Sequence, residues 1–368
     1  MARDLHGKPF KEHTLSKLEL FFDYTQTWLA VFVRSHDAKK RMPKKIRIYD
    51  FFCGPGRDES GQEGSPLLIM RALSEFHEDI KRCGLDVEVL FNDIEPEKVS
   101  QLRETLEKEG YTNGPWKLVF SNESFEEIST KVYPSMQGQG NLILLDQHGI
   151  KFFTPELFRK LRDLSWTDTI IFMSSSYAYR FRETPEIQQY LDAQKIFPSE
   201  THYYYVHRAI TQYFRTLVPH GSEYYLIPYS FKSGSNIYGL IFACGNALGA
   251  EKFLEAAWKR DKLTGEANYS IDGDKIDPEQ ASLFSEMDKP QKINVFEKEL
   301  ERELLTGELP TTADLYRYAL REGFLPKHVR PVFKRLCKEG YIEGDIAGLS
   351  YDSINNPRQI KLTGNTKK

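Results

Sequence analysis

The sequence predicts an α/β protein with a doubly wound parallel sheet and a second, smaller helical domain. From Ile46 onward, short apolar runs alternate with segments of helical periodicity, which is typical of a parallel sheet covered by helices on both faces. The 368 residues, 40% of them apolar and 13% aromatic, are enough for a large core and about two domains. We expect an N-terminal helical segment, a sheet domain, a linker and a C-terminal domain at 1–45, 46–263, 264–292 and 293–368.

A helical segment precedes the sheet. Leucine, phenylalanine and tryptophan recur at mostly helical spacing over 13–33, which predicts a helix or a helix pair packed on the domain that follows. The sheet domain then divides into five strands and their connecting helices. Strands are expected at 46–52, 87–91, 117–120, 141–145 and 169–173, and helices at 66–80, 96–109, 122–132 and 155–164.

Two further apolar runs close this domain. Residues 224–231 and 238–244 flank a Ser-Gly-Ser-Asn turn, which predicts an antiparallel hairpin, and a helix is expected at 250–262. Five parallel strands followed by an antiparallel hairpin are the layout of Rossmann-like methyltransferases. The sequence therefore predicts a Rossmann-like methyltransferase sheet.

The first strand leads into a glycine turn. Gly54, Pro55 and Gly56 leave little side-chain bulk where the backbone turns and where a nucleotide-like cofactor could approach. Asp50 lies near the carboxyl end of the strand, and Phe52 lies between it and the turn. A simple strand–loop–helix connection would also explain these residues, because a GxG motif alone is a weak signal.

Polar residues follow each strand at its carboxyl end. They are Asp50, Asp93, Asn122, Glu123 and Asp146. In open α/β sheets ligands bind at this edge, and an acidic residue after the second strand is the position that holds ribose hydroxyls. A single one would be explained as a helix cap, but four strand ends in succession favour a binding site. The three aspartates also leave open a weaker hypothesis, a nuclease with two divalent ions.

The segment 177–222 interrupts the alternation as an insertion, which we expect to be helical. It is rich in tyrosine and phenylalanine, interleaved with arginine, lysine and histidine. Tyrosine and arginine suit stacking on bases and contact with phosphates. They equally suit a protein interface, so both partners remain open here.

After the expected linker, rich in Gly, Asp, Ser and Pro, residues 293–368 predict a winged helix-turn-helix domain. Helices are expected at 295–305, 312–321 and 326–339, followed by short strands near 341–345 and 359–362. The third helix has a basic stripe opposite its apolar face, made of Lys327, Arg330, Lys334 and Lys338. Residues 326–368 contain nine Lys/Arg and four Asp/Glu, so this stripe is expected to bind nucleic acid. A solvated face on a protein-binding winged helix is the alternative.

The bulk composition excludes some classes of protein. A net charge of −3 argues against a histone-like protein that coats nucleic acid with its whole surface. The four cysteines, at 53, 83, 244 and 337, have no metal-ligand spacing, so we expect free thiols and no metal site. The first ten residues are polar, and no apolar run is long enough to cross a bilayer. A cytoplasmic protein is expected.

Four sequence motifs resemble one known family. They are DFFCGPGRD (50–58), GSPLLIM (64–70), the aspartate of LLDQHG (144–149) and GFLPKHVRPVFKRLCKEG (323–340). They resemble the three-Cys-motif partner (TcmP) family, a Rossmann-fold, methyltransferase-like group from bacteria, archaea and phages. The resemblance implies an S-adenosylmethionine site. Asp50, Phe52, Gly54, Pro55, Gly56, Asp93 and Glu123 are the expected cofactor-binding residues, with Asp93 on the ribose.

The resemblance also implies a partner and a context. Members of the family look like partners of a separate radical-SAM-like protein that carries three cysteines, in phage defence or nucleic-acid modification. This chain departs from the family after the fourth strand, where Asp-Pro-Phe/Tyr-Gly is replaced by Asp146, Gln147, His148 and Gly149. In amino-methyltransferases that position holds an exocyclic amine and stacks on a flipped base. Asp146 can accept a hydrogen bond from the amine, whereas His148 or Phe152 would have to stack on the base.

Two main hypotheses follow. In the first, the chain is a methyltransferase acting on nucleic acid, and its candidate catalytic residues are Asp146, Gln147 and His148. In the second, it is a catalytically inactive, cofactor-sensing subunit that binds nucleic acid for another enzyme, which the altered DQHG motif favours.

Overall fold

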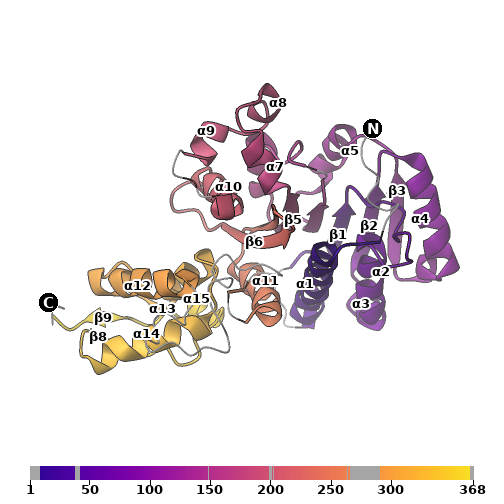
Figure 1. The fold of residues 1–368 in the computed structure, drawn as a ribbon. Coiled ribbons are helices and arrows are strands. Elements are labelled where there is room, and N and C mark those ends of the chain that lie inside the picture. Colours follow the sequence, from indigo (N-terminus) through magenta and orange to yellow (C-terminus); the bar gives the residue numbers. More distant parts are fainter. Residues whose placement is uncertain are drawn as a thin grey trace. The chain divides into compact units, whose positions relative to one another are not determined.

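The computed structural model describes residues 9–37, 42–147, 149–198, 201, 203–262, 264–265 and 291–364. The contacts within the chain divide it into two units, Met1–Lys252 and Phe253–Lys368, with the division inside helix α11. Each unit is described by itself. Figure 1 labels their helices and strands.

The first unit is built on a seven-stranded sheet in the order β3-β2-β1-β4-β5-β7-β6. Its strands are β1 (Lys45–Asp50), β2 (Asp86–Asn92), β3 (Trp116–Ser121), β4 (Gly140–Leu145), β5 (Thr167–Met173), β6 (Tyr225–Ser233) and β7 (Asn236–Cys244). The first five pair in parallel, whereas β7 is antiparallel to both β5 and β6. This confirms the predicted methyltransferase layout. The strand order reverses between β1 and β4, which makes their carboxyl ends the topological switch point.

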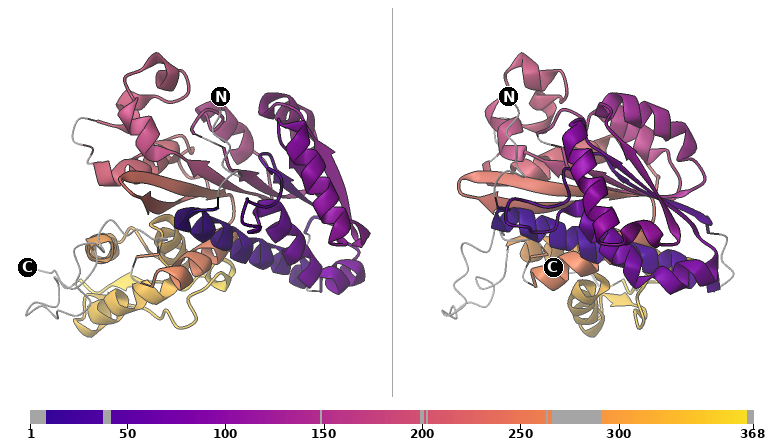
Figure 2. Two further views of the ribbon diagram at one scale, coloured as in Figure 1. Left: turned by 45° about the vertical axis from the view of Figure 1, so that its right-hand side comes forward. Right: turned by 90° about the vertical axis from the view of Figure 1, so that its right-hand side faces the viewer.

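Helices cover both faces of this sheet. They are α1 (Glu12–Asp37), α2 (Ser65–Glu75), α3 (His77–Cys83), α4 (Pro96–Lys108), α5 (Phe125–Val132) and α6 (Pro155–Arg162). Helix α11 (Ala247–Arg260) follows the last strand, and the division between the units falls within it. Figure 1 shows α1, α2 and α3 together below the sheet and α5 above it, and Figure 2 shows helices on both sides of the twisted strands. The expected helix at 66–80 is in fact two helices that break at Phe76, and 13–33 forms one helix rather than a pair.

The core lies between the sheet and these helices. Strand residues such as Ile48, Ile143 and Ile171 are completely buried, as are Leu20 and Leu29 of α1. Because both faces of the central strands are covered, their sequences are nearly continuous apolar runs, which is why the strands could be predicted.

The insertion after β5 is helical, as expected. It contains α7 (Ser175–Arg180), α8 (Pro185–Gln188), α9 (Ala193–Ile196) and α10 (Val206–Thr216). Its attachment to the sheet includes the buried His207, whose ring nitrogens contact Ser175 Oγ and Leu240 O, each at 2.9 Å. Burial lowers the pKa of His207 to about 4, so the neutral ring fixes the insertion against the hairpin.

The second unit contains the winged helix-turn-helix domain. Its elements are α12 (Gln291–Thr306), α13 (Thr312–Arg321), α14 (Pro326–Lys338), β8 (Ile342–Glu343), α15 (Asp352–Asn355) and β9 (Lys361–Leu362), with β8 and β9 antiparallel. Thr311 caps α13 by accepting a hydrogen bond from the Asp314 N–H at 3.2 Å. The short helix α15 was not predicted. Most of the expected linker lies outside the described residues. Among the helices that are described, none is long and apolar enough to cross a membrane.

Candidate active site

Three aspartates follow three adjacent strands at the switch point. Asp50 ends β1, Asp93 follows β2, and Asp146 follows β4. Because β2, β1 and β4 are neighbours in the sheet, the carboxyl groups of these residues share one edge. The structure thus places together the three strand-end acids that the sequence singled out.

Asp50 is completely buried. The Ser65 hydroxyl donates to its Oδ2 at 2.7 Å, and the Phe52 N–H donates to its Oδ1 at 3.3 Å. The pKa of Asp50 is raised to about 7, mainly by burial. The charges of Asp146 and Asp93 contribute to this rise, and the two hydrogen bonds oppose it. The edge therefore has a negative field that the protein itself does not fully neutralise.

The glycine turn is shaped by its backbone. Gly54 and Gly56 have φ values of 61° and 90°, a region that favours glycine. A Cβ added at Gly56 would lie 2.8 Å from a Leu102 methyl group, so packing also requires glycine there. The Gly54 N–H donates to Asp93 Oδ2 at 3.0 Å. The predicted cofactor residues of the first two strands are thus in direct contact.

Asp93 is half-buried and oriented by backbone groups. Besides Gly54, the Glu95 N–H donates to its other oxygen at 3.0 Å. An ionised carboxylate has about four acceptor positions, so Asp93 retains capacity for further donors such as hydroxyls. It lies after the second strand, where the sequence analysis expects a ribose-binding acid.

Asn92, which the sequence analysis did not single out, ties the loops of this edge together. Its buried side-chain amide donates to Phe51 O at 3.2 Å and to Glu123 O at 3.1 Å, and its oxygen accepts the Glu123 N–H at 3.1 Å. The Glu123 carboxylate itself contacts Lys131 and the Ser121 hydroxyl. Glu123 therefore joins the edge through its backbone, and the structure directs its carboxylate to other protein groups.

Asp146 forms an ion pair with Lys17 of α1. The Asp146 side chain is 26% exposed and that of Lys17 is 14% exposed, and the Lys17 ammonium also lies 5.0 Å from the centre of the Phe172 ring. Sequence reasoning missed Lys17. At 100° per residue, however, Lys17 falls on the same stripe of α1 as the buried Phe21 and Tyr24, and a basic residue in an apolar stripe was the available signal.

Gln147 is buried and both ends of its amide are used. Its nitrogen donates to Phe172 O at 3.3 Å, and its oxygen accepts the Phe152 N–H at 2.7 Å. These contacts give Gln147 the geometry of a residue that fixes the loop after β4. His148, the third candidate catalytic residue, lies outside the described residues.

Aromatic rings border the same edge. Phe52 stacks on Phe125 with ring centres 5.6 Å apart, and Phe152 lies 5.3 Å from Phe52 and 5.0 Å from Phe125. Phe52 and Phe152 are partly exposed. Phe52 lies just before the glycine turn and Phe152 on the loop that follows Asp146, and both offer flat apolar surface of the kind used in base stacking.

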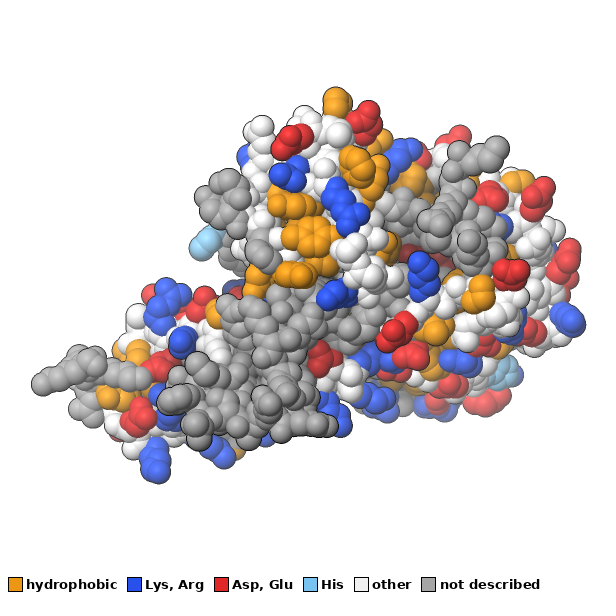
Figure 3. Space-filling view, in the orientation of Figure 1, with side chains coloured by type: hydrophobic (Ala, Val, Ile, Leu, Met, Phe, Trp, Pro, Cys, Tyr) orange, Lys and Arg blue, Asp and Glu red, His pale blue; other side chains and the backbone are white. Residues whose placement is uncertain are grey.

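The insertion adds exposed aromatic and basic side chains. Tyr177, Phe181 and Tyr204 are each more than two-fifths exposed. Arg180 donates to the Tyr203 hydroxyl at 3.0 Å, and the Arg182 guanidinium lies 4.4 Å from the centre of the Tyr179 ring. Figure 3 shows hydrophobic and basic side chains side by side over this part of the molecule. The insertion begins at the carboxyl edge of the sheet, because the Ser174 N–H donates to Gly149 O at 3.2 Å.

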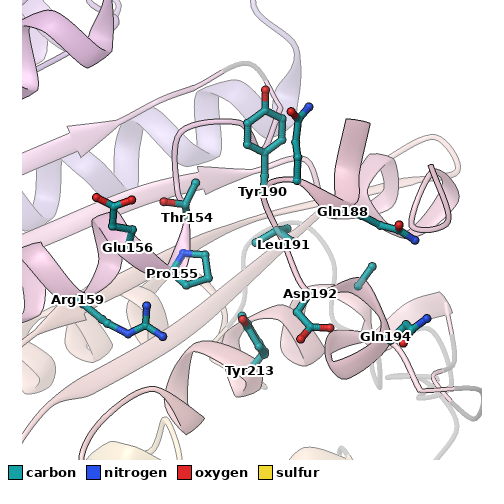
Figure 4. A pocket seen from close by; sticks show the side chains of 12 residues that line it. Thr154, Pro155, Glu156, Arg159, Gln188, Tyr190, Leu191, Asp192, Gln194 and Tyr213 are labelled. Carbon is teal, nitrogen blue, oxygen red and sulfur yellow. The ribbon is translucent and has the colours of Figure 1, made fainter. Parts of the chain in front are cut away.

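A cleft opens between α6 and the insertion. Its volume is about 670 Å³. Figure 4 shows that residues of the start of α6, of the α8–α9 segment and of α10 line it. This cleft could not be predicted from the sequence, because its walls come from segments that are far apart in the chain.

In the second unit, α14 presents its basic stripe to solvent. Val329, Val332, Phe333 and Leu336 are buried, whereas Lys327, Arg330, Lys334 and Lys338 are exposed. Within the part of the chain that the structure describes, Arg330, Lys334 and Lys338 make no ion pair, whereas the neighbouring Arg335 pairs with Glu301 at 2.6 Å. The charges of the stripe are therefore available to phosphates.

The edge does not form a metal site in the described residues. No three His, Cys, Asp or Glu side chains among them lie close enough together to hold a metal ion. Asp50, Asp93 and Asp146 therefore do not form the two-metal cluster that the nuclease hypothesis requires.

Comparison with known proteins adds one family match and several distant structures. Residues 270–347 match the model of the GMT-like wHTH domain. No protein with curated function matches the sequence. A SAM-dependent methyltransferase from Agrobacterium tumefaciens is similar at 11% identity and a TM-score of 0.32, over 64% of this chain and 62% of that one.

Two further solved structures cover more of their own chains. TrmK from M. capricolum, in complex with S-adenosyl-homocysteine, matches at 10% identity and a TM-score of 0.28, over 83% of this chain and 96% of that one. Trm1 from Pyrococcus horikoshii, with S-adenosyl-L-methionine, matches at 12% identity and a TM-score of 0.33, over 94% of each chain. At such values these likenesses say nothing of what this chain binds or does.

Proposed function

We propose that this chain is an S-adenosylmethionine-dependent methyltransferase that acts on nucleic acid. The observation that carries the proposal is the contact between the glycine turn and Asp93 at the switch point of a methyltransferase-type sheet. A carboxylate held by the turn it faces is arranged to bind the ribose of a nucleotide-like cofactor.

The residues of the edge fit this cofactor chemically. S-adenosylmethionine carries a sulfonium and an ammonium group, and a cationic ligand suits an edge where Asp146 and Asp93 both raise the pKa of Asp50. Asp93 would hold the ribose hydroxyls, and the backbone at Gly54 and Gly56, which have no side chains, would pass close to the ligand. When bound, the cofactor supplies an electrophilic methyl group.

The acceptor would be an amine of a base beside Asp146. The Asp146 carboxylate can accept a hydrogen bond from that amine and so orient its lone pair. Phe52 and Phe152 offer their faces for stacking, and Gln147 holds the loop that carries both Asp146 and Phe152. Lys17 would have to share the Asp146 carboxylate with the amine, so the strength of this ion pair would affect how well the amine is held.

Nucleic acid is the substrate class that the rest of the chain favours. The exposed stripe of α14 suits phosphates, and the aromatic and basic insertion suits bases. The motifs shared with the TcmP family extend the proposal to a three-cysteine, radical-SAM-like partner and to phage defence or nucleic-acid modification. That extension rests on sequence resemblance alone.

The proposal is tested first by calorimetric titration with S-adenosylmethionine and S-adenosylhomocysteine. Asp93→Ala is expected to abolish binding, whereas Asp86→Ala, at the opposite end of the same strand, is expected to leave it unchanged. The wild-type protein should then transfer labelled methyl groups to DNA or RNA, and Asp146→Ala should not. A wild-type protein that binds neither compound would overturn the proposal.

The contacts of Asp146 and Gln147 favour a second candidate, an inactive cofactor-sensing subunit. Asp146 is already paired with Lys17, and Gln147 is committed to holding the loop. This candidate predicts cofactor binding without methyl transfer to any nucleic acid, together with stable binding of a partner through the insertion. Undiminished partner binding after replacement of Tyr177, Phe181 and Tyr204 by alanine would exclude that role for the insertion.

A further inference from the structure

The cleft between α6 and the insertion has the size and position of a second part of the acceptor site. Its volume of about 670 Å³ lies within the usual range of ligand pockets. Its α6 wall begins at Thr154, two residues after Phe152, whose N–H is held by Gln147. The cleft therefore adjoins the loop that follows Asp146, on the side of the insertion.

The charges of the cleft favour an anionic ligand. Its two acidic residues are already paired, Glu156 with Lys160 at 2.8 Å and Asp192 with Lys195 at 2.7 Å. Arg159 is exposed, and its guanidinium makes no ion pair or hydrogen bond within the described part of the chain. Figure 4 shows it on the wall formed by α6, with its guanidinium directed toward Tyr213 of α10. A phosphate or a carboxylate would satisfy this arginine.

The other groups of the cleft favour a base over an aliphatic ligand. Tyr190 and Tyr213 are partly exposed, so that each offers ring surface to a ligand. Gln194 is exposed, and its amide, a donor and an acceptor in one group, has no side-chain hydrogen bond in the residues described. Aromatic faces, an amide and one free guanidinium together match a nucleotide, with a base, an edge to read and a phosphate. An acidic peptide would use the guanidinium and leave the rings and the amide without a partner.

We propose that this cleft binds a nucleotide of the acceptor strand that neighbours the nucleotide to be modified. Arg159 contacts its phosphate, Tyr213 stacks on its base, and Gln194 hydrogen-bonds to the edge of the base. The strand is single or locally opened at this point, because a stacked and paired base could not enter. The inference rests on the proposed function, since it takes the acceptor to be nucleic acid.

The experiment uses the full chain and short single-stranded RNA and DNA that carry a photoreactive base. Light-induced adducts are mapped by mass spectrometry, and affinity is measured by fluorescence anisotropy over a range of salt concentrations. Adducts are expected on the peptide that contains Tyr213. Arg159→Gln is expected to weaken binding about tenfold and to lower the salt dependence by about 0.7, the contribution of one phosphate contact in a single strand.

Matched variants separate the cleft from general charge and from folding. Arg103→Gln removes an exposed arginine from α4, away from the cleft, and should change affinity by less than twofold. Tyr213→Phe keeps the ring and should bind as the wild type does, whereas Tyr213→Ala should lose roughly tenfold. Urea titration of Arg159→Gln and Tyr213→Ala should give unfolding curves close to that of the wild type, which shows that both variants are folded.

The outcomes distinguish the cleft from the proposed function. Adducts confined to 326–361, with Arg159→Gln binding as tightly as the wild type, would overturn the proposal that the cleft binds a nucleotide, even if the protein methylates nucleic acid. Competition by an acidic peptide but not by unlabelled nucleic acid would overturn it in favour of a peptide site. Adducts in the cleft without methyl transfer would support the binding site while refuting the enzyme.

Discussion

The carboxyl edge of the sheet and the exposed face of α14 are both charged, but they are built in opposite ways. At the edge, acidic groups are buried or half-buried, held by backbone N–H groups, and strongly coupled to one another. On α14, basic groups stand in solvent, and none of the four makes an ion pair within the described residues. An arrangement of the first kind suits one small ligand of fixed shape, whereas one of the second kind suits any polyanion.

This difference has energetic consequences. A charge in a low-dielectric, hydrogen-bonded site interacts strongly with a ligand and alters protein stability, so changes there depend on pH. A solvated charge interacts weakly with any single partner and is screened by salt. Variants at the edge should therefore respond to pH, and variants of the stripe should respond to ionic strength.

The largest effect is expected when the whole stripe is neutralised. Replacing Lys327, Arg330, Lys334 and Lys338 by Gln should weaken binding to duplex DNA about a hundredfold or more at 0.1 M salt and lower the salt dependence by about 3–4. Stability should change by less than about 1 kcal/mol, because all four side chains are exposed. Anisotropy titrations at several salt concentrations measure this.

The matched control lies on the same helix. Arg335→Gln removes an equal charge that is already paired with Glu301 and Glu339, and it should change DNA affinity only about twofold. Equal losses from Arg335→Gln and from Lys334→Gln would show that net charge, rather than the stripe, sets the affinity.

The next largest effect concerns Asp50. Its pKa of about 7 in the folded protein exceeds the ordinary value of 3.8, so the folded state keeps a proton that the unfolded chain has lost. The contribution of Asp50 to stability should therefore be fully present below pH 4 and be lost as pH rises through 7. Asp50→Asn mimics the protonated form and should remove this fall, so that the variant is more stable than the wild type at pH 8 by about 1–3 kcal/mol in urea titrations.

The same variant should behave in the opposite way toward the cofactor. A cationic ligand favours ionised Asp50, so wild-type affinity for S-adenosylmethionine should rise about tenfold from pH 6 to pH 8, and that of Asp50→Asn should stay flat. A wild-type affinity that does not change over this range would separate Asp50 from the cofactor site. If the variant also lacked the stability gain, Asp50 would be an ordinary structural carboxyl.

These two regions were not equally accessible to sequence reasoning. The stripe follows from helical periodicity alone, since residues three and four apart share a face. The fold followed in the same way from apolar runs and the hairpin turn. The break between α2 and α3 and the short helix α15 did not, because brief helices depend on tertiary contacts more than on their own pattern.

The edge was predicted only in part. Asp50, Asp93 and Asp146 could be grouped because the carboxyl ends of adjacent parallel strands meet. The residues that pair with these aspartates could not be predicted, because pairing depends on which side chain of a distant helix lies within hydrogen-bonding reach. Lys17 is 129 residues from Asp146 in the chain. Glu123 shows the converse, since a suitable strand end does not determine which way its carboxylate turns.

A smaller effect should come from Lys17 itself. Lys17→Met removes the positive charge paired with the Asp146 carboxylate, so it should tighten binding of the cationic cofactor a few-fold, opposite in sign to Asp93→Ala. It should also destabilise the protein by about 1–2 kcal/mol, because Asp146 loses its partner. Lys17→Arg should retain both wild-type values. Calorimetry and urea titration test both parts, and weaker cofactor binding by Lys17→Met would contradict the ligand charge we infer.

The smallest effect concerns His328, which mirrors Asp50 in the second unit. Its ring lies 4.1 Å from that of Trp258, and its Nδ1 accepts the Leu325 N–H at the start of α14. Burial lowers the pKa of His328 to about 3, aided by the charges of Lys327 and Lys292. In the unfolded chain His328 binds a proton near pH 6.5, whereas in the folded state it stays neutral until near pH 3. The stability of this unit should therefore fall as pH decreases from 6.5 toward 3.

His328→Gln keeps an acceptor for Leu325 but does not titrate. The variant should be less stable than the wild type by about 1 kcal/mol at pH 7, because ring packing is lost. Its stability should also fall less than that of the wild type between pH 6.5 and pH 4. Hydrogen exchange of α14 peptides in urea, at pH values across that range, measures this unit within the full chain. Curves that fall in parallel for the two proteins would mean that acid destabilises the unit through other groups. The buried histidine would then contribute packing alone, and His328 would differ from Asp50 at the sheet edge in that its own proton binding is not coupled to stability.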